Sequence, residues 1–221
     1  MADHRLKTEL FDQFARIGAA LASGRRIEIL DVLANGERGV ETLAKEVELS
    51  VANTSRHLQV LKEAGLVVNR REGTSILYRL ATPEVYWLWA SLRSLATNRL
   101  AEVERLVSAY VGSRDELEPV TRQDLRRRLG AGEDLLILDV RPRDEFRAGH
   151  LPGAISIPLG ELLRRLDQLS QDRQVVAYCR GPYCAFAPEA VALLRSRGFE
   201  ARRLEDGLPE WAAAGLPTEI G

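Results

Sequence analysis

Apolar residues in the first half of the chain recur at spacings of three and four positions, the period of an amphipathic α-helix. This spacing predicts helices over Leu6–Leu21, Ile27–Leu33 and Val40–Val47. A fourth helix is expected to start after Ser50, a residue type that caps helix N-termini, and to end near Gly65, because glycine commonly terminates helices. The first half is therefore expected to be mainly helical.

The pattern changes to a period of two directly after Gly65. Two apolar runs, Leu66–Val68 and Ile76–Leu80, flank a polar tip that contains Gly73. Such a pattern predicts a β-hairpin with its turn at the glycine.

A further helix is expected to open at Pro83, with apolar positions that keep the helical spacing from Val85 to Tyr110 across the polar Arg99. This stretch and Leu6–Leu21 are too apolar for the surface of a small isolated domain. We therefore expect both to be packing seams of a homodimer.

The polar, aperiodic segment Gly112–Pro119 predicts a domain boundary, with a first domain at 1–112, a linker at 113–118 and a second domain at 119–221. Beyond it, strand-like runs alternate with helical stretches such as Leu162–Leu169 and Ala190–Arg197, which is typical of an α/β domain with a mainly parallel sheet. The expected strands are Leu135–Asp139, Ala154–Ile157, Val175–Tyr178 and Ala201–Leu204.

Composition changes this picture little. The 221 residues are 45% hydrophobic, which is enough to bury two cores. The net charge of -1 argues against binding nucleic acid through bulk positive charge, yet 50–80 holds five basic and two acidic residues, a local charge of +3. No apolar run approaches the roughly 20 residues of a membrane span, so we expect a cytoplasmic protein without a membrane partner.

The chain has two cysteines, Cys179 and Cys184, in one short loop. This is not the framework of a disulfide-stapled secreted domain, so local thiol chemistry is expected. The run Val175–Tyr178 places Cys179 at the carboxyl end of a buried strand, ahead of a helix rich in Ala and Leu. Loop N–H groups and the positive end of that helix should lower the thiol pKa, so Cys179 is expected to be the more acidic thiol.

The fourth helix and the basic hairpin predict a DNA-binding surface, with the helix in the major groove and the hairpin along the backbone. Asn53, Ser55, Arg56 and Gln59 are the candidates for base contacts. The candidates for phosphate contacts are His57, Lys62, Arg70 and Arg71. A helical protein-interaction domain without DNA is the alternative.

The stretch Leu21–Ala81 resembles the ArsR-type winged helix-turn-helix repressors, through Ser55-Arg56-His57-Leu58, Ala64-Gly65-Leu66-Val67 and Arg71-Glu72-Gly73. The resemblance implies an α+β domain, mainly helical with a β-hairpin wing, that dimerises through its first and last helices and binds double-stranded operator DNA. Members that sense metals carry cysteine, histidine or carboxylate ligands. This half has no cysteine, and no metal site is expected.

From Pro119 onward the chain resembles the rhodanese homology domain. The matching motifs are Leu138-Asp139-Val140-Arg141, Gly149-His150-Leu151-Pro152-Gly153-Ala154, the loop Cys179–Cys184 and Asp206-Gly207-Leu208-Pro209-Glu210-Trp211. The resemblance implies a persulfide formed on Cys179, with Arg180, Gly181, Tyr183 and Cys184 as the other candidate catalytic residues.

Two residues of the loop depart from the family pattern. Pro182 removes one N–H from the loop, and Cys184 stands where a polar residue often binds an anionic donor. Turnover of thiosulfate is therefore expected to be weak. Cys184 can instead attack modified Cys179 as a resolving cysteine, with a polysulfide link favoured over a plain disulfide, or it can be a small buried apolar residue.

Other residues of these motifs are expected to be structural. Asp139 and Arg141 are interpreted as a pair that holds the end of a strand, and His150 as a residue that fixes its loop by a hydrogen bond rather than a base.

The leading hypothesis is a regulator, interpreted as a repressor, whose sulfur or oxidant chemistry at Cys179 changes its affinity for operator DNA. Its small-molecule partner would be a sulfur donor or a low-molecular-weight persulfide, with no cofactor. One alternative is a rhodanese-type sulfurtransferase, with thiosulfate or a persulfide as donor, that its DNA-binding half localises. Another is a metalloid-responsive repressor that uses Cys179 and Cys184 as thiolate ligands, which could hold As(III) or Cu(I) only with outside help or a third donor.

Overall fold

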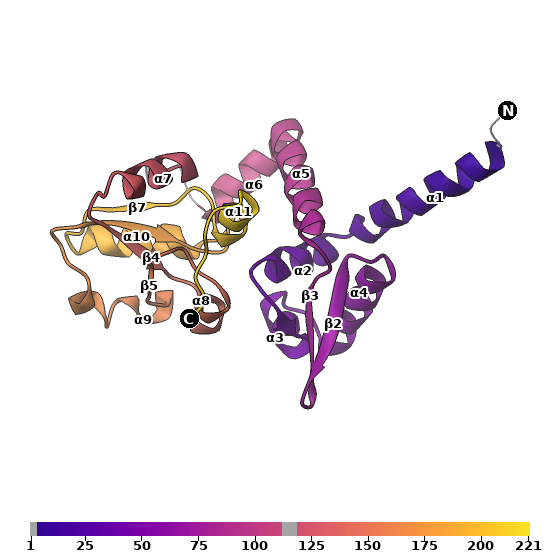
Figure 1. The fold of residues 1–221 in the computed structure, drawn as a ribbon, viewed down its shortest axis with the longest axis horizontal. Coiled ribbons are helices and arrows are strands. Elements are labelled where there is room, and N and C mark those ends of the chain that lie inside the picture. The colour runs from indigo at the N-terminus through magenta and orange to yellow at the C-terminus, as the bar shows by residue number, and fades with distance from the viewer. Residues whose placement is uncertain (1–3, 112–118) are drawn as a thin grey trace. The chain divides into compact units, whose positions relative to one another are not determined.

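The computed structural model describes residues 4–111 and 119–221 (Figure 1). The chain divides into two compact units, Met1–Leu92 and Arg93–Gly221. The linker predicted at 113–118 lies outside the described residues, so the predicted domain limits stay a prediction.

The first unit has the expected winged helix-turn-helix order. Its helices are α1 (His4–Leu21), α2 (Gly24–Ala34), α3 (Val40–Glu46), α4 (Val51–Glu63) and the first part of α5 (Pro83–Arg99). Apolar residues from all of these helices form one core, in which Ile29, Leu43 and Leu58 are fully buried.

Local sequence signals fix α4 at both ends. The Ser50 hydroxyl accepts a hydrogen bond from the Asn53 N–H at 3.3 Å, as an N-cap residue does. Gly65 follows the helix with φ +74°, a left-handed conformation that favours glycine. Between these ends, Thr54, Leu58 and Leu61 are buried, so the opposite face of α4 is left to solvent.

The predicted hairpin is β2 (Val67–Glu72) and β3 (Ser75–Leu80), with Gly73 at its turn and φ +59°. A third strand, β1 (Arg38–Gly39), pairs with the outer side of β3, giving the order β1-β3-β2. This strand was not predicted, because two residues are too short to show a period.

The two predicted seams expose many apolar side chains in the single chain. Only Ala20 is buried in α1, whose N-terminal part extends away from the rest of the first unit (Figure 1). Only Val85 and Tyr86 are buried in α5. The large apolar residues left exposed along these helices and in α6 (Ala101–Val111) include Leu6, Leu10, Phe11, Phe14, Trp87, Leu88, Leu95, Leu106 and Tyr110.

The single helix expected from Pro83 to Tyr110 is wrong, because the structure has two helices there. The first, α5, ends at Arg99, and α6 (Ala101–Val111) starts after Leu100. Glu102 and Glu104 lie in the first turn of α6, where acidic residues favour a helix start. The apolar spacing continues across the break and therefore conceals it.

The second unit contains the expected parallel sheet, with strand order β5-β4-β6-β7. The strands are β4 (Leu135–Asp139), β5 (Ile155–Ser156), β6 (Gln174–Tyr178) and β7 (Ala201–Arg203), and each lies within or beside its predicted range. The α+β domain followed by an α/β domain is therefore confirmed.

Helices cover both faces of this sheet. On one face, α9 (Leu159–Leu162) and α10 (Phe186–Ser196) pack against the β-strand residues that share the pleat of Cys179. On the other, α7 (Arg122–Gly130) and α11 (Leu208–Ala213) pack against a core that includes Tyr178. The remaining helix, α8 (Arg143–Ala148), follows β4.

The helix expected over Leu162–Leu169 is mostly absent. The structure has the short α9 and a 3-10 turn at Leu166–Gln168 instead. Arg165, with φ -123°, interrupts the helical path between them. Leu162, Leu166 and Leu169 still reach the core, so the apolar spacing was preserved without a continuous helix.

Candidate sulfur site and candidate DNA-binding surface

The predicted site cysteines lie in a tight loop of the second unit. Strand β6 ends at Tyr178, Cys179 follows it directly, and α10 begins at Phe186. Cys179 is 3% exposed and packs in the core, whereas Cys184 is partly exposed. The loop closes on itself through a hydrogen bond from the Cys184 N–H to the Gly181 carbonyl at 3.2 Å.

Backbone groups surround both sulfur atoms. The Cys179 Sγ lies 3.9 Å from the Gly181 carbonyl oxygen and 3.7 Å from that of Cys184. N–H groups of Gly181 and Ala187 bond to Cys179, and those of Arg180 and Phe186 bond to Cys184. Each thiol is therefore held by main-chain donors, which favour a thiolate.

The order of acidity expected for the two thiols is wrong. Burial raises the pKa of Cys179 well above its ordinary value, and the neighbouring Cys184 raises it further. The hydrogen bond from Cys179 lowers the pKa of Cys184, with burial opposing and the charge of Arg180 assisting. Desolvation at the end of the buried strand thus outweighs the loop N–H groups at Cys179, and Cys184 is the more acidic thiol.

Arg180 pairs with a carboxylate outside the loop. Its guanidinium donates to the Glu145 carboxylate of α8, with Nε–Oε1 2.9 Å, and lies over the Phe186 ring at 5.7 Å. Glu145 is 1% exposed and lies 3.9 Å from the Arg141 guanidinium. Glu145 was not identified from the sequence, because its partners lie in other motifs.

The outer side of the loop packs against the start of α11. The Glu210 carboxylate accepts a hydrogen bond from the Gly207 N–H at 3.0 Å and caps that helix. A Cβ at Gly181 would lie 3.5 Å from both carboxylate oxygens of Glu210, so loop and helix are in close contact. Tyr183, also in the loop, shares a hydrogen bond of 2.7 Å between its hydroxyl and that of Thr97 in α5.

We predict that Gly207→Ala displaces the cysteine loop. Gly207 has φ -115°, which any residue adopts, but an added Cβ would lie 2.4 Å from the Arg180 carbonyl carbon and the Gly181 nitrogen. Because both neighbours are backbone, relief requires the loop to move, at a cost of about 1–3 kcal/mol in the free energy of unfolding. Denaturant unfolding and the alkylation rate of Cys184 measure the two effects.

Gly160→Ala is the matched control, because nothing lies within 4 Å of its added Cβ. It should leave stability and alkylation unchanged. If Gly207→Ala behaved like Gly160→Ala in both measurements, the close packing of loop and helix would be wrong.

Asp139, Arg141 and His150, which were expected to be structural, form buried contacts within the second unit. Arg141 is fully buried and pairs with Asp139, with Nη2–Oδ2 2.6 Å, and also donates to the Gly149 carbonyl at 2.7 Å. Burial would lower the pKa of Arg141, but the hydrogen bonds and charge of Asp139 outweigh it, so the pKa is raised. His150 Nδ1 lies 2.9 Å from the Phe146 carbonyl, and the two rings stack.

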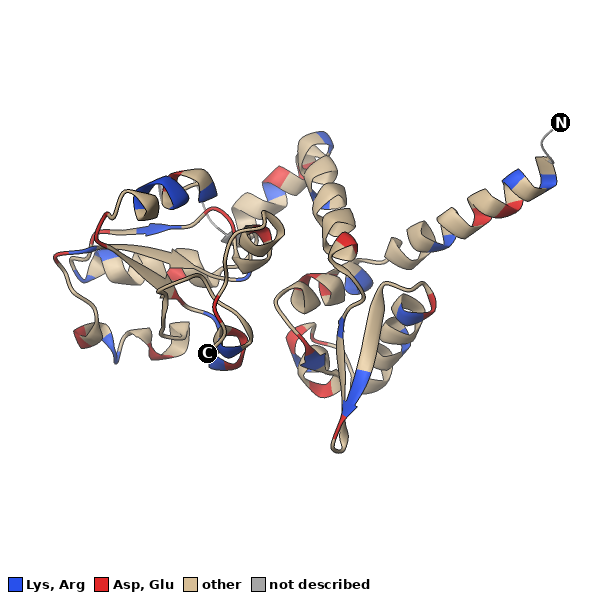
Figure 2. Ribbon diagram, viewed as in Figure 1, with Lys and Arg blue, Asp and Glu red and all other residues tan. Residues whose placement is uncertain are grey.

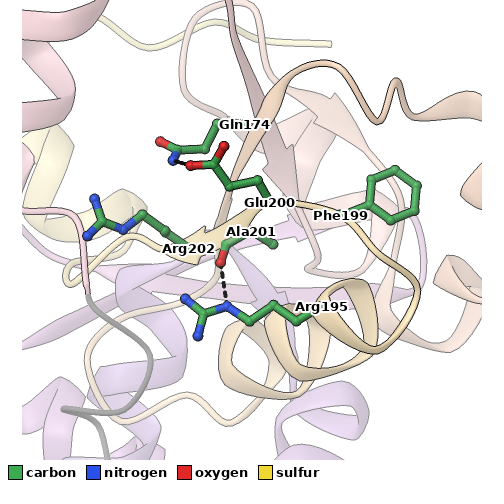
Figure 3. A pocket seen from close by; sticks show the side chains of 6 residues that line it. All are labelled: Gln174, Arg195, Phe199, Glu200, Ala201 and Arg202. Atoms are coloured by element: carbon green, nitrogen blue, oxygen red, sulfur yellow. Dashed lines mark hydrogen bonds between the residues drawn. The ribbon is translucent and has the colours of Figure 1, made fainter.

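A pocket of about 510 Å³ lies at the other end of β6. Its lining includes Gln174, which starts β6, and Arg195, which donates to the Ala201 carbonyl at 2.8 Å (Figure 3). Gln174 also bonds to Glu200, as Figure 3 shows. Since Cys179 follows the opposite end of this strand, the pocket is separate from the cysteine loop.

The candidate DNA-binding residues gather on the solvent face of α4 and on the hairpin, where Figure 2 shows basic residues. Seven of them are exposed and His57 is partly exposed. The exposed ones are Asn53, Ser55, Arg56, Gln59, Lys62, Arg70 and Arg71.

Three of these side chains have partners within the unit. Gln59 donates to Glu63 one helical turn away at 2.8 Å. Arg70 is held by Glu37 at 2.6 Å and by Glu72 at 2.9 Å, whose hydrogen bonds raise its pKa. Arg70 is therefore partly neutralised, and Arg71, which donates to the Gly73 carbonyl, is the stronger candidate for a phosphate contact.

Among the described residues, no group of three or more His, Cys, Asp or Glu side chains is placed to hold a metal ion. Within the same residues, no helix has the length and apolar character needed to cross a membrane.

Family models match both halves of the chain. The model for bacterial regulatory proteins of the arsR family matches residues 23–68, and that for the rhodanese-like domain matches residues 121–214. Over 215 residues the chain is 49% identical to the HTH-type transcriptional regulator Rv0324 of Mycobacterium tuberculosis, covering 97% of this chain and 94% of that protein. The chain belongs to the ArsR family of transcriptional regulators.

Each half of this ArsR-family regulator also has relatives of its own. The second half is 32% identical over 99 residues to a sulfurtransferase of Allochromatium vinosum, covering 44% of this chain and 91% of that protein. The first half is similar to a homodimeric winged helix-turn-helix DNA-binding domain from Mycobacterium bovis, with 47% identity and a TM-score of 0.42, covering 43% of this chain and 89% of that one.

Proposed function

We propose that this regulator is a cytoplasmic, homodimeric repressor that binds double-stranded operator DNA and accepts sulfur on Cys179 from a low-molecular-weight persulfide. The observation that carries the proposal is the pair of thiols in one closed loop, each held by main-chain N–H groups, in a chain that also has an ArsR-family helix-turn-helix. The exposed apolar side chains of α1, α5 and α6 support the dimer, since a second copy would cover them.

The two thiols divide the chemistry between them. Cys184, the more acidic, accepts a hydrogen bond from Cys179 and can take its proton. The Cys179 thiolate then attacks the terminal sulfur of a persulfide donor. The sulfur–sulfur bond of the donor breaks, a new one forms at Cys179, and the donor leaves as a thiolate, so no external oxidant is required.

Cys184 can convert the Cys179 persulfide into a more lasting bridge between the two cysteines. Its thiolate can attack the Cys179 sulfur that carries the added atom, which forms a disulfide and releases hydrosulfide. If both cysteines are persulfides, the outer sulfur of the Cys179 persulfide attacks the Sγ atom of Cys184. The bond from that Sγ to its own added sulfur breaks, hydrosulfide leaves, and a trisulfide forms. The extra atom lengthens the bridge and relieves the strain of a direct disulfide in so tight a loop.

A sulfurtransferase is the second candidate function, because the second half is similar to an enzyme of that name. Steady turnover of a sulfur donor with an added thiol acceptor would favour it. Uptake of sulfur without continued turnover, together with a change in DNA affinity, would favour the regulator.

For DNA binding, we expect Arg56→Ala and Gln59→Ala to change base preference and Arg71→Ala to weaken binding to all sequences alike. Arg56 and Gln59 lie on the solvent face of α4, whereas Arg71 lies on the hairpin. Loss of a good base contact should cost about tenfold in affinity for the preferred operator. Selection of bound sequences from a random pool, followed by titration at two salt concentrations, gives both quantities.

Arg126→Ala is the matched control, because Arg126 is an exposed arginine on α7 of the second unit. It removes the same charge and should leave operator affinity unchanged. Unaltered binding by all three test variants would show that α4 and the hairpin are not the DNA-binding surface.

A further inference from the structure

One face of α5 carries contacts that belong to both units. Trp89, Arg93 and Thr97 follow one another at intervals of four residues, so they line one side of the helix. The Trp89 Nε1–H donates to the Asp31 carboxylate of α2 at 2.9 Å, within the first unit. Arg93 and Thr97, one and two turns further on, belong to the second unit and contact its cysteine loop region.

Arg93 forms a largely buried ion pair with Glu210. The Arg93 Nη2 to Glu210 Oε1 distance is 2.6 Å, and the side chains are 13% and 8% exposed. The other oxygen of this carboxylate caps Gly207, whose backbone is packed directly against Arg180 and Gly181. Arg93 therefore holds Glu210, which caps the helix start at Gly207 that packs against the cysteine loop.

Arg93 also offsets the negative charge of two neighbouring carboxyl groups, those of Asp206 and Glu210. Burial raises the pKa of the Asp206 carboxyl, and the charge of Glu210 raises it further, while Arg122 and Arg93 oppose both effects. Without Arg93, the described contacts leave the Glu210 carboxylate with the Gly207 N–H alone. A buried carboxylate in that position is costly, so the ion pair is a firm attachment of α5.

A second contact attaches α5 to the loop itself. The hydroxyl groups of Thr97 and Tyr183 lie 2.7 Å apart. The Arg93 guanidinium lies 5.8 Å from the centre of the Tyr183 ring, within range of a cation–π interaction. Tyr183 is directly adjacent to Cys184, so movement of that cysteine is transmitted to the tyrosine through one peptide bond.

Cys179 is 3% exposed and closely surrounded, so sulfur added to it is expected to displace part of the loop. Carbonyl oxygens lie 3.7 Å and 3.9 Å from Cys179 Sγ, and an added sulfur would stand about 2.05 Å from it. The backbone of Arg180 and Gly181 is packed against Gly207, where an added Cβ would lie 2.4 Å from it, so this part of the loop has little freedom to move. The displacement is therefore directed to the rest of the loop, which includes Tyr183.

We propose that Arg93 and Thr97 are positioning residues through which α5 responds to the sulfur state of the Cys179–Cys184 loop. This inference rests on the proposed function. It adds that the signal passes along one helix, from Tyr183 and Glu210 through Arg93 to the Trp89–Asp31 contact at α2.

The test compares operator affinity of reduced and sulfur-loaded protein, with glutathione persulfide as the donor and loading verified by mass spectrometry. Wild type should change its affinity at least about fivefold, the lower range of allosteric coupling. The variant Arg93→Met with Thr97→Val should load sulfur to the same level, bind DNA normally when reduced, and lose most of that change. A purely structural role for the two residues would alter stability but not this ratio.

Two further variants keep the test decisive. Arg93→Met with Glu210→Gln removes the ion pair without leaving a buried charge, so it guards against a folding failure and should lose the response as well. Arg99→Met alters an exposed arginine of the same helix that has no partner among the described residues, and it should respond as wild type does.

The outcomes separate the two proposals. A wild-type protein whose DNA affinity ignores sulfur loading would overturn the proposed function. A responsive wild type with equally responsive Arg93 variants would overturn this inference alone. Failure of the variants to accept any sulfur would also overturn it, because α5 would then serve the chemistry rather than its transmission.

Discussion

Cys179→Ser is expected to abolish stable sulfur uptake. In wild type, treatment with a persulfide donor should add sulfur that mass spectrometry locates in the Cys179–Cys184 loop. In the variant, none should be retained, since the serine hydroxyl does not form a persulfide. The loss is expected to be complete rather than partial.

The expectation depends on the different surroundings of the two thiols. Cys179 is 3% exposed, so a persulfide there is protected from exchange with solvent thiols. Cys184 is partly exposed, and sulfur placed on it alone would be open to reducing thiols. Acceptance at Cys179 also uses the proton acceptor that Cys184 supplies.

Cys184→Ser is the matched variant. It should still form a persulfide on Cys179, but more slowly and in a form that mild reductant removes, because no second thiol can close the bridge. Full and lasting sulfur loading of the Cys179→Ser protein would refute the assignment of Cys179 as the acceptor.

The pH dependence of thiol alkylation gives an independent check. The hydrogen bond from Cys179 is the largest cause of the lowered pKa of Cys184, so Cys184 should react at a lower pH than an ordinary thiol. Cys179→Ala removes the donor, and the alkylation midpoint of Cys184 should then move to higher pH.

Strong local periodicity made most of the fold predictable. The capped helix from Ser50 to Gly65 and the alternating strands of the hairpin and of the parallel sheet follow patterns that local sequence alone displays. The break between α5 and α6 at Leu100 cannot be seen in the sequence, because the apolar spacing continues across it. Strand β1 cannot be seen either, because two residues are too few to show a period. Chain breaks and short edge strands depend on tertiary packing.

The cysteine loop was predictable as a site, but its electrostatics were not. Cys179 was expected to be the more acidic thiol from the loop N–H groups and the following helix, which are local features. Its burial depends on the packing of α10 and the sheet, which are assembled from residues far apart in sequence. The same holds for Glu210, whose partner Arg93 lies 117 residues away.

Asp139→Asn is expected to cost the second unit about 3–5 kcal/mol in free energy of unfolding, the usual result of leaving one buried charge without its partner. The two carboxylate oxygens of Asp139 accept three hydrogen bonds from the Arg141 guanidinium, and both side chains are 0% exposed. Asparagine keeps the shape and can still accept from the Arg141 N–H, but it removes the charge. Glu145, at 3.9 Å from Arg141, replaces only part of it.

Denaturant unfolding followed by tryptophan fluorescence, to which the buried Trp211 of the second unit contributes, measures this loss. Glu161→Gln is the control, because Glu161 pairs with Arg143 at the same 2.6 Å separation, and with Arg165 at 3.1 Å, but in a partly exposed position. Solvent screens these pairs of Glu161, so their loss should shift the unfolding midpoint far less. Equal shifts for the two variants would mean that burial is not what makes the Asp139–Arg141 pair important. A larger shift for Asp139→Asn would place that pair among the main supports of the strand end from which Cys179 is presented.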